Sequence, residues 1–250
     1  MTGLYDGLDP TALARRWSLP RVLVLPQTTS TMDEAHALAA RGAAAGTLVL
    51  AHVQTAGRGR SGGSWVAVEG ASVLCTLIER PRHTSALDVL SLRVGLSVAA
   101  ALDAFAAAPV GVKWPNDLII DSGKVAGILV EARWRDSRLE WVAIAIGINV
   151  GAAPSQHGTA RALRPGVARL MVLDAVVGAL RGAAAKEGPL TQSELAAWSA
   201  RDRLVGKRIT APVAATVRGI LPTGELVLDT PTGEAALRSG SVTLAEGETL

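Results

Sequence analysis

Two long apolar segments joined by a short polar turn constrain the fold most strongly. Residues 123–134 (GKVAGILVEARW) and 140–150 (EWVAIAIGINV) are rich in aliphatic residues, and the intervening RDSR is typical of a turn. This pattern predicts a hairpin of two neighbouring antiparallel strands. A sheet that contains such a hairpin departs from strict alternation of parallel strands and helices, so we expect an α+β fold.

Further strands and helices are predicted ahead of residue 203. Thr31 followed by Glu34 is a capping-box signature for a helix that continues to Arg41. Because hairpins and helices are mixed, the predicted sheet is mixed and mainly antiparallel. The other predicted strands cover 21–25, 46–54, 72–79 and 110–120, and the predicted helices cover 10–17, 31–41, 84–107, 167–186 and 191–200.

The sequence pattern of the chain changes after Val205. Short β-type runs are punctuated twice by Pro-Thr-Gly, which predicts a small antiparallel barrel or sandwich. A length of 250 residues fits a main domain with a small second one. We therefore predict a large main domain, the one expected to be catalytic, over 1–203 and a small β domain over 204–250.

Composition bounds the class of protein. With 49% hydrophobic residues the chain can build a sizeable core, and a net charge of +3 with scattered arginines does not favour nucleic acid as the main partner. The lone Cys75 lies in an apolar run and is expected to be a buried structural thiol. No secretion signal or membrane-length apolar run is recognisable, so a cytoplasmic protein without membrane contact is expected.

A glycine-rich stretch at 54–65, QTAGRGRSGGSW, raises the question of a nucleotide site. Gly57, Gly59 and Gly62 match the spacing of a dinucleotide-binding fingerprint, which requires a helix directly after the glycines. Residues 62–72 carry further glycines and then enter a predicted strand. Without that helix no helix N-terminus would hold a pyrophosphate, so a dinucleotide oxidoreductase is disfavoured.

The same stretch is better explained as a loop that closes on a different anion. Glycines let the backbone approach a ligand, and the guanidiniums of Arg58 and Arg60 can bind a carboxylate or phosphate in bidentate fashion. Trp65 is a candidate apolar anchor. A solvated basic loop remains the alternative on these residues alone.

A second group of candidate residues lies between 113 and 149. Lys113 ends a predicted strand just before a Trp-Pro pair, where its compact charge could reach an oxygen-rich ligand. Asn116 and Asp117 follow as typical turn residues. Gly127 inside a strand suggests close backbone approach, and Asn149 is either a side-chain ligand or a strand-end cap.

Five segments in this order resemble the biotin protein ligases, or biotin–[acetyl-CoA-carboxylase] ligases. They are STMDEA, QTAGRGRSGGSW, KWPNDLII, KVAGILVE and GINV. The resemblance implies a catalytic domain like that of class II aminoacyl-tRNA synthetases, followed by a small SH3-like β-barrel. It implies an ATP-dependent, AMP-forming ligase that makes biotinyl-5′-AMP and passes biotin to a lysine of a biotin carboxyl carrier protein domain of an acyl-CoA carboxylase. A lipoate or octanoate ligase or transferase of related fold is the alternative.

The resemblance also implies roles for individual residues. Lys113, Arg58 and Arg60 would act in catalysis, with Mg²⁺ bound to the ATP phosphates and no metal site of the protein's own. Asp117 is a candidate base for the transfer step. The biotin site would comprise Ser30, Thr31, Met32, Gln54, Arg58, Gly59, Arg60, Lys113 and Gly127, and the ATP or adenylate site would comprise Gly57, Arg58, Arg60, Trp65, Lys113, Asn116 and Asn149.

The chain departs from the family pattern in two places. The loop continues as Ser61-Gly62-Gly63, where family members commonly carry further basic residues, which leaves its hold on phosphate open. Only about 20 residues precede the first predicted strand, too few for a winged helix-turn-helix. We therefore expect a ligase without repressor function or specific DNA binding, whose homodimer, if it forms, is weak or ligand-dependent.

Overall fold

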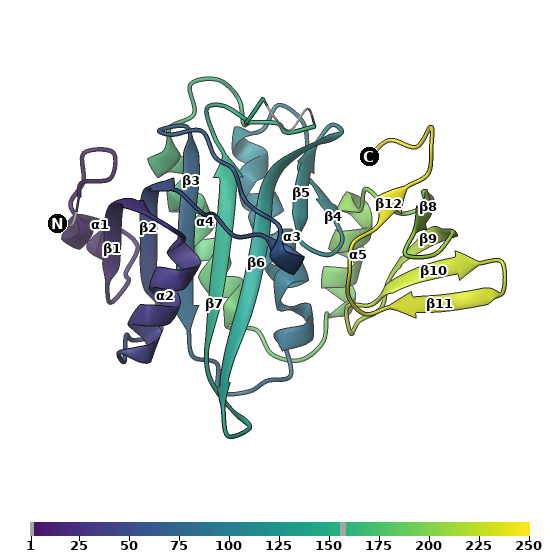
Figure 1. The fold of residues 1–250 in the computed structure, drawn as a ribbon, viewed down its shortest axis with the longest axis horizontal. Coiled ribbons are helices and arrows are strands. Elements are labelled where there is room, and N and C mark those ends of the chain that lie inside the picture. The colour runs from purple at the N-terminus through teal and green to yellow at the C-terminus, as the bar shows by residue number, and fades with distance from the viewer. Residues whose placement is uncertain (1–2, 156–158) are drawn as a thin grey trace.

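A seven-stranded sheet forms the centre of the computed structural model, which describes residues 3–155 and 159–250 (Figure 1). Its order is β1-β2-β3-β7-β6-β5-β4; β1 and β2 are parallel and the other neighbours antiparallel. The predicted mixed, mainly antiparallel sheet is thus confirmed. The strands are β1 (Val22–Thr28), β2 (Thr47–Gln54), β3 (Ser72–Glu79), β4 (Gly111–Lys113), β5 (Asp117–Ile120), β6 (Gly123–Arg135) and β7 (Arg138–Asn149).

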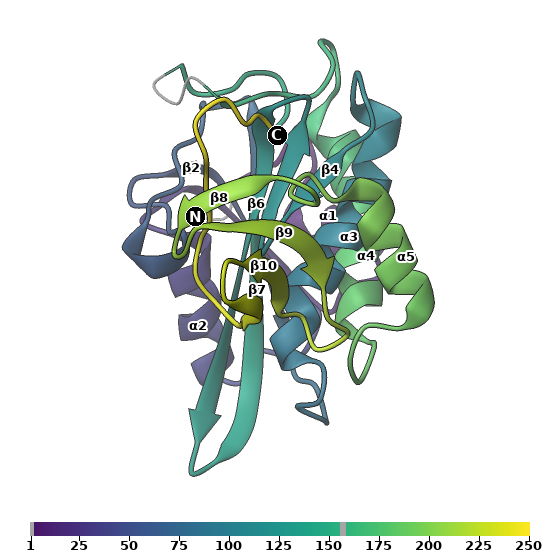
Figure 2. The same ribbon diagram turned by 90° about the vertical axis from the view of Figure 1, so that its right-hand side faces the viewer.

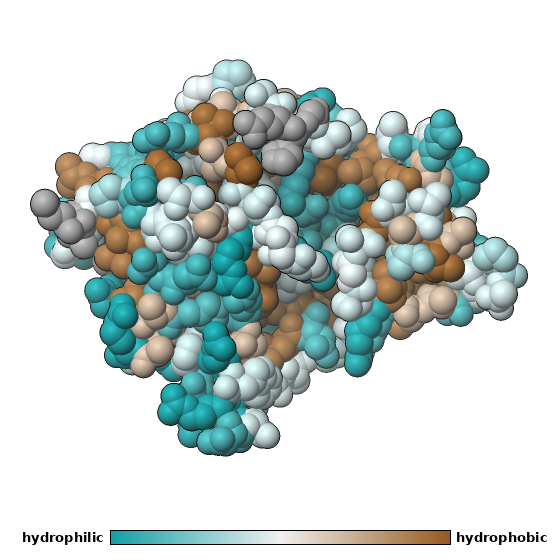
Figure 3. All heavy atoms as spheres, in the orientation of Figure 1, coloured by the Kyte–Doolittle hydropathy of each residue, from teal (hydrophilic) through white to brown (hydrophobic). Residues whose placement is uncertain are grey.

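The predicted hairpin is the pair β6–β7. Gly127 lies opposite Gly147 in the register. Asp136 and Ser137 form the turn with φ of 47° and 62°, the left-handed values that suit a two-residue hairpin connection. The hairpin projects from the body of the molecule, and its end is hydrophilic (Figures 1 and 3).

Helices cover both faces of the sheet. α3 (Leu90–Leu102) and α4 (Arg169–Ala184) lie on one face, and α2 (Thr31–Ala40) lies on the other (Figures 1 and 2). β3 is therefore buried from Ser72 to Ile78. Cys75 is fully buried there, as predicted, and burial raises the pKa of its thiol to about 12.

Two predicted elements are shorter or divided. The helix expected over 84–107 is α3 flanked by the 3₁₀ turns η2 (Leu87–Val89) and η3 (Asp103–Phe105). Asp103 accepts hydrogen bonds from the Val110 amide and Arg201, which turns the chain toward β4. The strand expected over 110–120 is divided into β4 and β5, an antiparallel pair folded around Pro115.

The predicted capping box at the start of α2 is wrong. Ser30 is the N-cap, and its Oγ accepts a hydrogen bond from the Met32 amide. The Glu34 side chain accepts instead from the Thr28 hydroxyl. A capping box is present at α5 (Gln192–Arg201), where Thr191 and Glu194 satisfy each other's backbone amides.

The C-terminal segment forms a second, antiparallel sheet beyond α5 (Figure 1). Its five strands have the order β11-β10-β9-β8-β12. No helix in the described part of the chain is long and apolar enough to cross a membrane. The remaining elements are α1 (Pro10–Arg16), β8 (Arg208–Ala211), β9 (Ala215–Ile220), β10 (Leu226–Thr230), β11 (Gly233–Leu237) and β12 (Thr243–Leu244).

Candidate functional site

The glycine loop that follows β2 crosses the face of the sheet in front of β7 and β6 (Figure 1). The loop is folded on itself, because the Trp65 amide donates to the Gly57 carbonyl and the Gly59 amide to the Gly63 carbonyl. A Cβ at Gly57 would lie 2.4 Å from the Trp65 oxygen, so this position requires glycine. The loop opens only the 3₁₀ turn η1 (Arg60–Gly62) and then leads toward β3, which removes the dinucleotide interpretation.

The start of α2 supplies one wall of a cavity beneath this loop. The amide and hydroxyl of Thr31 both donate to Gln54 Oε1, at 2.7 and 2.9 Å, and Thr76 donates to the Thr31 hydroxyl at 2.9 Å. These bonds fix the polar end of Gln54 between α2 and β2. Ser30, Thr31, Met32 and Gln54, predicted from distant motifs, therefore come together in the lining of one cavity of about 70 Å³.

The opposite wall is a pair of glycines covered by an indole. Trp65 lies on Gly127 and Gly147 of the β6–β7 hairpin; an added Cβ at Gly147 would come 2.3 Å from its ring. The close approach predicted at Gly127 is thus observed. The buried Trp65 Nε1 has no hydrogen-bond partner among the described residues, so this donor is available to a ligand group.

The lysine in this cavity is Lys124 and not the predicted Lys113. Lys124 Nζ lies 5.4 Å from the centre of the Trp65 ring and 2.6 Å from Asp117 Oδ1. Lys113 is the last residue of β4. The described residues that line the cavity do not include it. Two features of the sequence mark Lys124: it is one of only four lysines, and it directly precedes the VAGILVE segment.

The two loop arginines have different partners. Arg58 donates to Asp33 and Glu131, at 2.8 and 2.5 Å. Arg60 donates to two neutral oxygens, Asn116 Oδ1 at 3.4 Å and the Gly240 carbonyl at 3.1 Å. Burial lowers the pKa of Arg60. Arg58, Gly59, Arg60 and Asn116 all line the cavity, so Asn116, expected on the ATP side, lies with the residues expected to bind biotin.

An adjoining hollow of about 200 Å³ extends the site toward the end of β7. It shares Trp65 and Lys124 with the first cavity and is also lined by Asn149. Asn149 donates to the Arg161 carbonyl at 3.1 Å, whereas its buried Oδ1 has no partner within residues 3–155 and 159–250. Two compartments thus meet at a tryptophan and a lysine.

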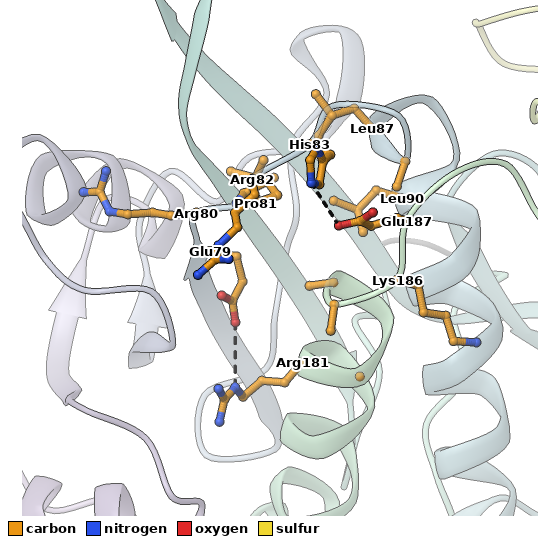
Figure 4. A pocket seen from close by; sticks show the side chains of 15 residues that line it. Glu79, Arg80, Pro81, Arg82, His83, Leu87, Leu90, Arg181, Lys186 and Glu187 are labelled. Carbon is orange, nitrogen blue, oxygen red and sulfur yellow. Dashed lines mark ion pairs between the residues drawn. The ribbon is translucent and has the colours of Figure 1, made fainter.

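A larger hollow of about 460 Å³ lies at the other end of β3, against α3 and α4. Two ion pairs lie in it: Glu79 faces Arg181 at 3.8 Å, and His83 faces Glu187 at 3.7 Å (Figure 4). Arg80 points away from it and donates to three backbone carbonyls. None of the predicted site residues lines this hollow, so we place the candidate site under the glycine loop.

The chain is similar in sequence to known protein ligases. A model of the biotin/lipoate A/B protein ligase family matches residues 24–149, just over half of the 250 residues. The biotin–[acetyl-CoA-carboxylase] ligase of Paracoccus denitrificans is 40% identical over 146 residues, which are 57% of this chain and 58% of that protein. The bifunctional ligase/repressor BirA of Bacillus subtilis is 40% identical over 128 residues, 51% of this chain and 39% of BirA.

The alignments with these curated relatives therefore span about two fifths to three fifths of their lengths. A solved structure, the biotin protein ligase from Aquifex aeolicus in complex with biotin and ATP, is similar with a TM-score of 0.75 and 23% identity. The similarity covers 90% of this chain and 98% of that one. At this identity the likeness shows a shared fold.

Proposed function

The chain belongs to the biotin/lipoate A/B protein ligase family, and from this premise we propose that it activates biotin with ATP and transfers it to a lysine of a carboxyl carrier domain. One observation carries the proposal. Two compartments, one ending at Thr31 and Gln54 and the other at Asn149, meet at Lys124. Adenylation needs this arrangement, because a carboxylate and a nucleotide phosphate must be brought together.

The polar cavity is proposed to hold biotin and the second hollow the adenine side of ATP. The fixed groups of Thr31 and Gln54 suit the polar ureido ring, and the Trp65 indole, which lies on Gly127 and Gly147, offers an apolar surface to the rest of biotin. The Asn149 Oδ1 and the Trp65 indole N–H are buried without partners among the described residues, and they would bond to the nucleotide. Arg58, Gly57, Gly59 and Met32 would complete the enclosure.

In the proposed first step, a biotin carboxylate oxygen attacks the α-phosphorus of ATP, and the bond to the β-phosphate oxygen breaks. Pyrophosphate leaves and biotinyl-5′-AMP forms. The two reacting anions repel each other, and a positioned cation stabilises the charge that builds up. Lys124 is held there by Asp117 and Arg60 by Asn116, so we assign these two cations to the step, with Lys124 in the role first expected of Lys113.

Mg²⁺ is proposed to enter with the ATP phosphates, which are its preferred ligands. Residues 3–155 and 159–250 contain no group of three His, Cys, Asp or Glu side chains that could hold a metal. When bound, the ion would neutralise phosphate charge. The protein's own contribution is to orient the α-phosphate and to exclude water from the reactive anhydride.

In the proposed second step, the neutral amine of a carrier lysine attacks the anhydride carbonyl. The bond from the carbonyl carbon to the AMP phosphate oxygen breaks, AMP leaves, and the nitrogen loses a proton to solvent as the amide forms. Asp117 contacts Lys124, so its first role would be to orient that lysine, and a role as base is secondary. The carrier would belong to an acyl-CoA carboxylase. The division at residues 203 and 204, a cytoplasmic location, a weak dimer and the absence of specific DNA binding remain predictions.

An ATP–pyrophosphate exchange assay tests the proposed function directly. Exchange should depend on biotin, and mass spectrometry should then find biotin on a single lysine of an added carrier domain. Exchange that responds to lipoate or octanoate and ignores biotin would refute the proposal and support the related acyl ligases.

A further inference from the structure

Arg58 is held by carboxylates from two separate elements. Asp33 lies in the first turn of α2, beside the biotin-side wall, and Glu131 lies on β6, four residues beyond Gly127. The guanidinium donates to both, at 2.8 and 2.5 Å. One side chain therefore ties the glycine loop to both walls of the cavity that the loop covers.

Glu131 is in turn held from behind by a histidine. His36 Nε2 lies 3.0 Å from Glu131 Oε2, and Trp141 Nε1 lies 2.9 Å from His36 Nδ1. An indole N–H can only donate, so Nδ1 is the acceptor and Nε2 carries the hydrogen that faces Glu131. Each Glu131 oxygen thus accepts one bond, from His36 and from Arg58, and rotation of the carboxylate would break both.

The charges at Arg58 and Arg60 suit different tasks. Two carboxylates surround Arg58 and offset its positive charge, so it has little attraction left for an anionic ligand. The two atoms bonded to Arg60 are neutral oxygens. The side chain available to an anion is therefore Arg60, and Arg58 is placed to hold the loop.

We infer that Arg58 is a latch that keeps the glycine loop closed over the cavity, and that Asp33, Glu131 and His36 are the positioning residues of this latch. The inference rests on the proposed function for its purpose, which is to retain the reactive adenylate. The latch itself involves only groups of the chain. Opening it should speed loss of the adenylate without removing Lys124 or Arg60 from the reaction.

Hydrogen–deuterium exchange of the loop amides, followed by mass spectrometry on protein without added ligands, tests the latch. Glu131→Gln and Asp33→Asn keep the shape of each side chain and remove its charge. Each should raise exchange over residues 55–66 roughly fivefold, the effect expected when a partly exposed ion pair is lost. Glu140→Gln is the matched control, because Glu140 pairs with Arg135 at 2.9 Å near the far end of the same hairpin. Its loop exchange should equal wild type, and unchanged loop exchange in Glu131→Gln would overturn the latch.

A double-mutant cycle separates the latch from general loosening. If Glu131 acts through Arg58, Arg58→Gln combined with Glu131→Gln should open the loop no further than Arg58→Gln alone, which already loses the pairs with both Asp33 and Glu131. Effects that add up would overturn the inference. His36→Leu should also raise loop exchange. His36→Gln keeps an N–H donor toward Glu131, so its loop exchange should stay close to that of wild type. Wild-type exchange in His36→Leu would remove His36 from the latch.

The adenylate off-rate connects the latch to the proposed reaction. Glu131→Gln should release biotinyl-5′-AMP several-fold faster and form it at nearly the wild-type rate. If loop exchange responds as expected but wild-type protein shows no biotin-dependent ATP–pyrophosphate exchange, the proposed function fails and the latch stands. If wild-type protein is active and loop exchange is the same in all these variants as in wild type, the latch fails and the proposed function stands.

Discussion

Arg93 and Arg58 both form ion pairs with carboxylates, but their surroundings differ. Arg93 on α3 is 1% exposed and bonds to both oxygens of Glu194 and to the carbonyls of Gly188 and Pro189. Arg58 has a side chain 39% exposed and belongs to a glycine-rich loop. The first links helices that form the permanent core, whereas the second links a movable segment to that core.

The difference suggests how to tell a structural ion pair from a functional one. Loss of a partner at Arg93 leaves a charge buried in a medium that cannot solvate it. Loss of a partner at Arg58 lets water solvate the guanidinium, so little stability is lost and the position of the loop changes. Substitutions in the Arg93 region should therefore affect folding, and those around the glycine loop should affect activity.

The largest effect is expected from Glu194→Ala. It removes the partner of a buried guanidinium and should lower the free energy of unfolding by about 3–5 kcal/mol, measured by urea denaturation. Lys186→Ala removes the other cation on Glu194, but Lys186 has a side chain 53% exposed and its loss should cost less than about 1 kcal/mol. Similar losses for the two variants would contradict the distinction between buried and solvated pairs.

Lys124→Ala should reduce biotin-dependent ATP–pyrophosphate exchange about 100-fold, as expected when a cation that stabilises the transition state is removed. Its unfolding free energy should stay close to wild type, because the Lys124–Asp117 pair is partly exposed. Lys113→Ala is the matched control and should retain most activity. If Lys113→Ala is the inactive variant, the lysine named by the sequence motif is the correct one.

Stability should also depend on pH through Glu194. Burial acts to raise its pKa, but hydrogen bonds from Arg93, the Thr191 amide and Lys186 outweigh burial and bring the pKa to about 2, below its ordinary 4.5. The stabilisation is therefore complete above pH 4.5 and is lost as pH falls toward 2, by at most about 1.4 kcal/mol per pH unit. Acid denaturation of Glu194→Gln should lack this component, and parallel profiles for variant and wild type would contradict it.

The sequence predicted the backbone of the site better than its side chains. The β6–β7 hairpin and buried β3 were predicted because apolar runs of strand length leave few alternatives. Local capping was misjudged: Thr31 and Glu34 match the spacing, yet Gln54 engages Thr31, and this tertiary contact left Ser30 as the cap.

The choice between the two lysines failed for a similar reason. Lys113 is the last residue of β4 and Lys124 the second residue of β6, and the sequence does not show which of these two strand ends lines the cavity. The partners of Arg58 were equally hidden, since Asp33 and Glu131 are separated from it by 25 and 73 residues. Contacts of that separation come from sheet order, and sequence periodicity carries no information about it.

The smallest effect, and the one most specific to the loop region, is expected from Gly147→Ala. The new Cβ would lie 2.3 Å from the Trp65 ring, so the indole must shift and the loop above it must move. The cost should be about 1–3 kcal/mol if the ring is trapped and less if the loop yields. Biotin affinity, measured by calorimetry, should fall in either case.

Gly178→Ala on α4 provides the control for the glycine change itself. An added Cβ there meets nothing within 4 Å in the described structure, so this variant should gain about 0.5–1 kcal/mol from helix propensity and bind biotin normally. If Gly147→Ala binds biotin as tightly as Gly178→Ala, Trp65 does not form a wall of the biotin site. A loss of affinity with little loss of stability would show that the loop absorbs the clash, which is the behaviour that separates the Arg58 region from the rigid surroundings of Arg93.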